Sequence, residues 1–210
     1  MRPVFRLNSP VDFFLRSPGQ PATLGVLPGS FNPLTIAHIG LADAATCLVD
    51  EVLFVLPRSL PHKEYSGASF SERIDMLLAA LRGRPACSIA ASTGGLFAEI
   101  AGECRTAYGE RVRLSFLCGR DAAERIAGWD YRREGEFARM LQSFDLLVAT
   151  RGGAYHPPSG LGAAIRPLPF SPAFEPVSSS DIRARIHRGE PWEHLVPPAI
   201  HNQVRKIYLP

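Results

Sequence analysis

The sequence predicts an α/β protein, built as a single domain on a doubly wound parallel sheet. Short apolar runs alternate with segments in which apolar residues recur at helical spacing, and this alternation is typical of a parallel sheet covered on both faces. A chain of 210 residues is long enough for one domain with a substantial core, and too short for two independent ones. Its 46% hydrophobic and 20% charged residues are ordinary for a soluble globular protein.

The first predicted strand, residues 22–27, is an apolar run that ends at Pro28-Gly29, as a buried strand would. Ser69-Phe70-Ser71-Glu72 has the form of a capping box and predicts a helix that continues to about Leu81. Further strands are expected at 51–56, 87–91, 113–117 and 146–149, with a weak one near Ile165, and further helices at 35–48, 96–108, 121–127, 134–143, 179–188 and 198–206. This order predicts a Rossmann-like sheet, which binds its ligands at the carboxyl ends of the strands.

Composition restricts the class of function. The formal charge is only +3 and no run of basic residues occurs, so we expect no nucleic-acid partner. Residues 1–21 are interrupted by prolines and are predicted to be an N-terminal extension, with the domain at 22–210. We expect no signal peptide, no membrane segment and a cytoplasmic location. The cysteines are far apart and are expected to be reduced core residues; they are Cys47, Cys87, Cys104 and Cys118.

The segment after the first strand carries the first candidate site. Gly29-Ser30-Phe31-Asn32-Pro33 leads directly into a predicted helix that contains Thr35 and His38. Glycine lets a backbone approach a ligand closely, and a helix N-terminus offers free N–H donors to an anion. His38 would face the same anion, although on this evidence alone the favoured interpretation is a polar residue at a helix start.

A second candidate site lies near the end of the chain, where Ser178-Ser179-Ser180 opens a helix that holds Arg183 one turn later. Hydroxyls, free amides and an arginine at a helix start suit an oligophosphate. A serine N-cap is the structural alternative, and both interpretations apply to the same residues.

Other strand ends add weaker candidates. Lys63 follows the second strand and could reach a phosphate. Gly119-Arg120-Asp121 follows the fourth strand, where a carboxylate could accept ribose hydroxyls or simply stabilise a first helical turn. Trp129 could stack on a base, or belong to the core.

These residues resemble a known family. The first loop with Thr35 and His38, together with the 178–183 segment, is similar to the paired signature of the adenylyl- and cytidylyltransferase superfamily. Within it, the chain most resembles the nicotinate/nicotinamide mononucleotide adenylyltransferases. Further support comes from Pro61-His62-Lys63, Glu72-Arg73, Gly119-Arg120-Asp121 with Trp129, Arg151-Gly152 and the ending 195–208.

The resemblance implies transfer of AMP from ATP to a small phosphate-bearing acceptor, with Mg²⁺ bridging phosphate oxygens and with few or no protein ligands to the metal. It implies that His38 donates to the triphosphate, with Thr35 beside it, and that Arg183 helps to hold the outer phosphates. The ATP contacts that it implies are Gly29, Ser30, Phe31, His38, Gly119, Asp121, Ser178, Ser179 and Arg183. The acceptor contacts that it implies are Ser30, Lys63, Trp129 and Arg151.

The sequence departs from the family pattern in two places. Ala37 stands where the family often has glycine, and residues 92–97 read Ser-Thr-Gly-Gly-Leu-Phe where bacterial relatives usually carry a Tyr-Thr element that helps to hold the pyridine ring. Other acceptors, such as phosphopantetheine, therefore stay open, as does CTP as donor. A catalytically weak nucleotide-binding protein is the alternative from another class. The oligomeric state is also open, with a homo-oligomer as one outcome.

Overall fold

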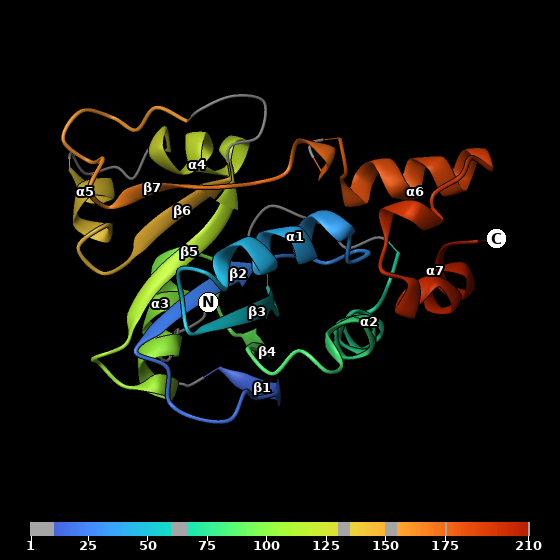
Figure 1. The fold of residues 1–210 in the computed structure, drawn as a ribbon, viewed down its shortest axis with the longest axis horizontal. Coiled ribbons are helices and arrows are strands. Elements are labelled where there is room, and N and C mark those ends of the chain that lie inside the picture. The colour runs from blue at the N-terminus through green and yellow to red at the C-terminus, as the bar shows by residue number, and fades with distance from the viewer. Residues whose placement is uncertain (1–10, 60–66, 130–134, 150–154, 175, 210) are drawn as a thin grey trace, which may run out of the picture.

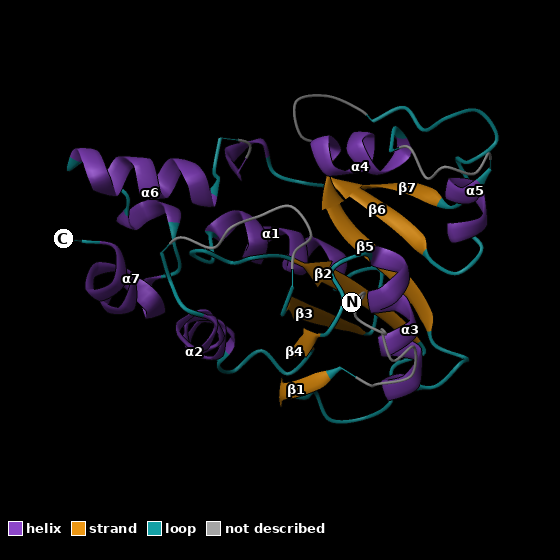
Figure 2. Cartoon of the chain, turned by 180° about the vertical axis from the view of Figure 1, so that it is seen from behind, coloured by secondary structure: helices purple, strands orange, loops and turns teal. Residues whose placement is uncertain are grey.

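The computed structural model describes residues 11–59, 67–129, 135–149, 155–174 and 176–209. Within these ranges the strands form one seven-stranded sheet in the order β1-β4-β3-β2-β5-β6-β7 (Figures 1 and 2). All neighbouring strands are parallel except β1, which is antiparallel to β4. The strands are β1 (Asp12–Leu15), β2 (Thr23–Pro28), β3 (Glu51–Pro57), β4 (Cys87–Ser92), β5 (Arg113–Gly119), β6 (Asp145–Ala149) and β7 (Ile165–Leu168). The predicted α/β class and the doubly wound parallel sheet are confirmed.

Helices cover both faces of this sheet. One group, α1, α2, α6 and α7, gathers on the side where the chain ends, and α3, α4 and α5 lie toward the other side (Figure 1). The α-helices are α1 (Ile36–Ala45), α2 (Phe70–Leu81), α3 (Phe97–Tyr108), α4 (Arg120–Ala127), α5 (Glu136–Met140), α6 (Ser179–Arg188) and α7 (His201–Tyr208). Short 3₁₀ turns occur at Pro172–Phe174, Glu193–Leu195 and Pro198–Ile200.

Alternate side chains along each strand belong to two separate apolar cores, one under each group of helices. In β3, Val52, Phe54 and Leu56 pack with α1, α2, α6 and α7, whereas Leu53 and Val55 pack with α3, α4 and α5. Successive side chains of a strand point to opposite faces. A strand that is buried on both sides is therefore apolar along most of its length, as β3 is after Glu51.

The structure differs from the sequence prediction at the N-terminus. The predicted extension contains β1, in which Asp12, Phe13 and Leu15 pair with β4, and Val11 is buried. The fold therefore includes a strand about ten residues before the predicted start. A short antiparallel strand can add to a sheet edge wherever the neighbouring strand leaves its N–H and C=O groups open.

Two smaller differences concern the fifth helix and the cysteines. The helix predicted at 134–143 is α5 in the structure, and it is shorter than predicted. It begins directly after Gly135, whose backbone is in the left-handed region at φ 73°. All four cysteines are free, but Cys47 is exposed while Cys87, Cys104 and Cys118 are buried. The core prediction was wrong for Cys47, which follows the end of α1 at Ala45 and lies on the surface.

Across the described segments, no helix is both long and apolar enough to cross a membrane.

Candidate active site

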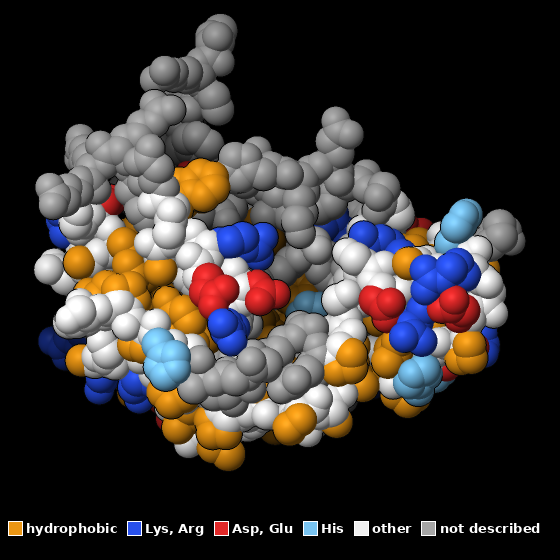
Figure 3. Space-filling view, turned by 90° about the horizontal axis from the view of Figure 1, so that it is seen from above, with side chains coloured by type: hydrophobic (Ala, Val, Ile, Leu, Met, Phe, Trp, Pro, Cys, Tyr) orange, Lys and Arg blue, Asp and Glu red, His pale blue; other side chains and the backbone are white. Residues whose placement is uncertain are grey.

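The strand order itself indicates where a ligand binds. The chain builds β2, β3 and β4 in one direction across the sheet, then crosses back and continues with β5, β6 and β7 in the other. Ligands of such sheets bind at this switch point, in the crevice beyond the carboxyl ends of the strands. Here the crevice is bordered by the first loop (residues 29–34), which follows β2, and by the start of α4, which follows β5. Viewed from above, the surface is hollowed between α4 and α6, and a histidine side chain lies at the bottom of the hollow (Figure 3).

The backbone of the first loop is held in one tight conformation. The Gly29 N–H donates to the Val55 carbonyl at 3.0 Å. Phe31 has a positive φ of 46°, a conformation that costs energy for a residue other than glycine and is found mostly at functional sites. Its ring is buried and packs on Phe54 at 5.7 Å between centroids and on His38 at 5.2 Å. A Cβ on residue 29 would lie 2.9 Å from that ring, so glycine is required there.

Thr35 and His38 form a reciprocal cap at the start of α1. The Thr35 hydroxyl accepts from the His38 N–H at 3.3 Å, and the Thr35 N–H donates to His38 Nδ1 at 3.0 Å. Because Nδ1 accepts this bond, it carries no proton, and the neutral ring holds its proton on Nε2. Burial lowers the pKa of His38 to about 4. At neutral pH His38 is therefore an uncharged, oriented N–H donor beside the first loop.

The two candidate sites, far apart in the sequence, meet in the structure. Ser179 Oγ donates to the Pro33 carbonyl at 2.8 Å, and Arg183 Nη1 donates to the Asn32 carbonyl. Ser178 caps α6, because its hydroxyl accepts from the Asp181 N–H at 3.1 Å. The N-cap alternative for Ser178 is thus realised, and the start of α6 is attached directly to the first loop.

Sequence reasoning named Asn32 in the first loop and Arg73 in a family motif, but it assigned neither of them a role in this site. Arg73 is buried in α2, and its guanidinium donates to the Ser30 and Ser69 carbonyls, each at 3.2 Å. The Asn32 side chain is also buried and accepts from the Ala68 N–H at 3.2 Å. The sequence contains a hint that Arg73 is buried. It is a charged residue on the helix face that also carries Ile74 and Leu77, and the rest of that face is apolar. Asn32 stands within the first motif, but nothing local shows that its side chain is buried against Ala68.

The segment after β5 fits its prediction in position. Gly119 is the N-cap of α4 and Asp121 lies exposed in the first turn, at the border of the crevice. Arg120 pairs with Glu124 at 2.7 Å on the same helix. Trp129 follows the end of α4 and is 54% exposed, so it is not a core residue. Lys63 and Arg151, both predicted acceptor contacts, lie outside the described residues.

The loop after β4, where the Tyr-Thr element is missing, is stabilised by two carboxylates of α3. Glu103 accepts from the N–H groups of Thr93 and Gly94 at 3.0 Å, and Glu99 accepts from those of Gly95 and Leu96 at 3.0 Å. Burial raises the pKa of Glu103, an effect that the two N–H donors oppose. Four consecutive amides of residues 93–96 are therefore already occupied within the chain.

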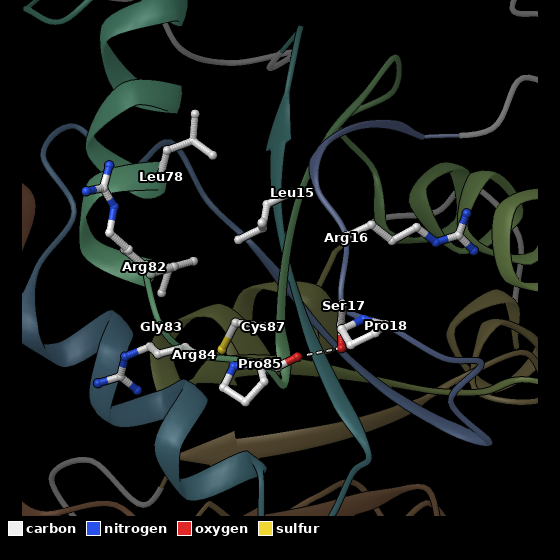
Figure 4. A pocket seen from close by; sticks show the side chains of 11 residues that line it. Leu15, Arg16, Ser17, Pro18, Leu78, Arg82, Gly83, Arg84, Pro85 and Cys87 are labelled. Carbon is white, nitrogen blue, oxygen red and sulfur yellow. Dashed lines mark hydrogen bonds between the residues drawn. The ribbon is translucent and has the colours of Figure 1, made fainter.

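A second hollow lies elsewhere, between β1 and the end of α2. This open cavity of about 710 Å³ has an apolar floor of Leu15, Leu78, Leu81 and Cys87 (Figure 4). Its arginines are largely engaged, since Arg84 pairs with Asp43 and the Arg16 guanidinium lies 4.6 Å from the centroid of the Phe13 ring. No predicted site residue lines it. The crevice at the switch point is the better candidate for an active site.

Comparisons with known proteins cover the part of the chain that forms this crevice. Residues 26–185 match the cytidylyltransferase-like family, a range that includes both the first loop and the start of α6. The chain is 30% identical over 201 residues to the probable nicotinate-nucleotide adenylyltransferase of Bordetella pertussis, covering 89% of this chain and 96% of the relative. It is 28% identical over 202 residues to the protein of the same name from Bordetella avium, covering 89% and 98%.

Among solved structures, the fold is similar to that of Plasmodium falciparum nicotinic acid mononucleotide adenylyltransferase complexed with NaAD. The TM-score is 0.70 with 16% sequence identity, over 88% of this chain and 95% of that chain. A second structure of the Plasmodium enzyme, complexed with APC, gives a TM-score of 0.67 at the same identity.

Proposed function

The chain belongs to the nicotinate-nucleotide adenylyltransferases, within the cytidylyltransferase-like family, and we propose that it transfers AMP from ATP to nicotinate mononucleotide, or to the nicotinamide form. In this reaction a phosphate oxygen of the acceptor attacks the α-phosphorus of ATP. The bond from that phosphorus to the bridging oxygen of the β-phosphate breaks, and pyrophosphate leaves with the electron pair. The product is a dinucleotide, so the enzyme serves NAD biosynthesis.

The observation that carries the proposal is the neutral His38 donor at the start of α1. Adenylyl transfer needs no protein nucleophile, because the acceptor itself attacks. The protein must align two anions and stabilise charge that spreads over the phosphate oxygens. A donor that is oriented by Thr35 and uncharged at neutral pH suits this task, and nearby N–H groups of the first loop would add to it.

For ATP, we propose that Arg183 and Ser179 hold the outer phosphates from the start of α6, with Ser178 shaping that helix start. Among the described residues, Arg183 uses both Nη1 hydrogens and one Nη2 hydrogen in bonds to the protein. The Nε–H and the second Nη2 hydrogen are left for a phosphate. Gly119 and Asp121 would hold the ribose from the other side of the crevice. Both residues lie at the start of α4, which follows β5 on the other side of the switch point from the first loop, and this position supports the division.

For the acceptor, we propose that Ser30 and Lys63 hold the phosphate, with Arg151 nearby, and that Trp129 stacks on the ring. The exposure of Trp129 beyond the end of α4 supports this role, because an exposed aromatic face can stack on the ring of a ligand.

We propose that Mg²⁺ accompanies ATP. Within the described ranges, no group of three or more His, Cys, Asp or Glu side chains could hold a metal ion. The residues around the crevice therefore fit an ion that is carried by phosphate oxygens and water, as is common for Mg²⁺. When bound, the ion would offset negative charge on the outer phosphates. The free cysteines support a cytoplasmic location.

The test is pyrophosphate release with Mg-ATP and, in separate reactions, nicotinate mononucleotide, nicotinamide mononucleotide and phosphopantetheine. We expect release with a pyridine mononucleotide and none with phosphopantetheine. Phosphopantetheine as the preferred acceptor would replace the proposed substrate, and the occupied amides of residues 93–96 are the feature that would then explain it. Binding of ATP without release from any acceptor would overturn the proposed activity.

A further inference from the structure

We propose that Tyr208, in the last turn of α7, is a positioning residue for the phosphate-transfer step. Its hydroxyl holds the Asn32 side chain, and through Asn32 it fixes the first loop against the bound phosphates. This inference rests on the proposed function of the crevice. It adds a residue from the end of the chain that would never touch a substrate.

The contact joins residues 176 positions apart in the sequence. The Tyr208 hydroxyl donates to Asn32 Oδ1, and the same oxygen accepts from the Ala68 N–H at 3.2 Å. Both ribbon views place α7 beside α2 and α6 (Figures 1 and 2). The Tyr208 ring also packs against the apolar cluster formed by these helices. Burial raises the pKa of Tyr208 to about 12, so the hydroxyl stays protonated and able to donate.

Close packing around this pair supports a specific rather than an incidental contact. Gly67 has φ +94°, and a Cβ there would lie 2.9 Å from Tyr208 Cε1 and 3.1 Å from Asn32 Oδ1. The chain passes so near to both side chains that only glycine is accommodated. The Asn32 amide is thus enclosed by α7 on one side and by residues 67 and 68 on the other.

Fixing Asn32 matters because of how the rest of the loop is oriented. Arg73 binds the Ser30 carbonyl, and Arg183 binds the Asn32 carbonyl. The carbonyls are thereby held by α2 and α6. The N–H groups of Ser30 and Phe31 donate to no acceptor among the described residues. With the Ser30 and Asn32 carbonyls bound and the Ser30 and Phe31 amides open among the described residues, this part of the loop is arranged to receive an anion.

The test compares Tyr208→Phe with the wild-type enzyme in steady-state pyrophosphate release. Phenylalanine keeps the ring packing and removes only the hydroxyl. We expect kcat to fall about tenfold, the factor for one hydrogen bond of about 1.4 kcal/mol, with the KM for ATP nearly unchanged. The reason is that misplaced loop amides would stabilise the transition state less, while most ATP contacts remain.

Tyr108→Phe is the matched control. The Tyr108 hydroxyl is also inside the protein and donates to Glu51, but Glu51 begins β3 at the opposite end of the sheet. We expect this variant to lower thermal stability and to leave kcat unchanged at temperatures well below unfolding. A general loss of stability therefore cannot imitate the predicted change in kcat.

Two outcomes would overturn the inference. One is an unchanged kcat in Tyr208→Phe while the wild type is active. The other is a kcat loss of equal size when Tyr208→Phe is added to Asn32→Ala, because a residue that acts through Asn32 has no further effect once that side chain is removed. Failure of the proposed function is distinguishable from both, since then the wild type itself would release no pyrophosphate.

Discussion

Replacing His38 with alanine tests the centre of the mechanism. The structure makes the ring a neutral donor, because burial lowers its pKa to about 4. The Thr35 N–H fixes Nδ1 at 3.0 Å, so the Nε2–H is already oriented before substrate binds. Removing one pre-oriented donor of this kind costs on the order of 3 kcal/mol of transition-state stabilisation. That energy corresponds to a fall in kcat of about 150-fold.

The assay is pyrophosphate release at saturating ATP and acceptor, with thermal unfolding measured on the same samples. His187→Ala is the control, because His187 is exposed on α6 and should leave kcat unchanged. His38→Gln retains an N–H donor on a different geometry, and we expect its kcat to lie between those of wild type and His38→Ala. Turnover of His38→Ala near the wild-type value, in a folded protein, would refute the role assigned to this ring.

Three further predictions concern the supports of the crevice. Arg183→Lys should lower kcat/KM by tenfold or more, because a lysine cannot bridge two carbonyls and a phosphate with one planar fork; an unchanged value would remove Arg183 from the phosphate site. Gly94→Ala should destabilise the fold by about 1–3 kcal/mol in urea unfolding, because its Cβ would lie 2.4 Å from Glu99 Oε2. Gly102→Ala, with nothing within 4 Å of its Cβ, should be neutral or stabilising, and an equal loss in both would contradict the steric argument. Because the pKa of His38 is lowered from 6.5 to about 4, its contribution to stability is complete above pH 6.5 and is lost as the pH falls toward 4. The difference in unfolding free energy between wild type and His38→Ala should therefore shrink by up to about 3 kcal/mol from pH 7.5 to pH 4, and a constant difference would contradict the lowered pKa.

Sequence patterns with a short range were sufficient for the elements that border the crevice. The helix predicted at 179–188 has those bounds in the structure, because a serine cap and a following left-handed glycine act within a few residues of the helix ends. The capping box predicted at Ser69 forms, and the apolar run of β3 became a strand buried on both faces. These signals depend on neighbours in the chain, so the chain alone reports them.

The same short range explains what was missed. The strand Asp12–Leu15 is fixed by its pairing with β4, and the prolines around it indicated only irregular structure. Cys47 looked like a core residue from composition, but its exposure depends on where α1 ends and which way the chain leaves. Neither property has a local signature in the sequence.

The sequence by itself determined the order of strands and helices from β2 onward, the two motifs at their ends and, by resemblance, the family. Tertiary structure alone decided that these motifs form one site, because the bond from Arg183 to Asn32 spans 151 residues and depends on how α6 crosses the loop after β2. It also decided the state of His38, since desolvation is a property of the surroundings that the fold assembles. It brought Arg73 and Tyr208 to the first loop for the same reason: hydrogen bonds between distant segments follow from helix packing and sheet register, which no local pattern encodes.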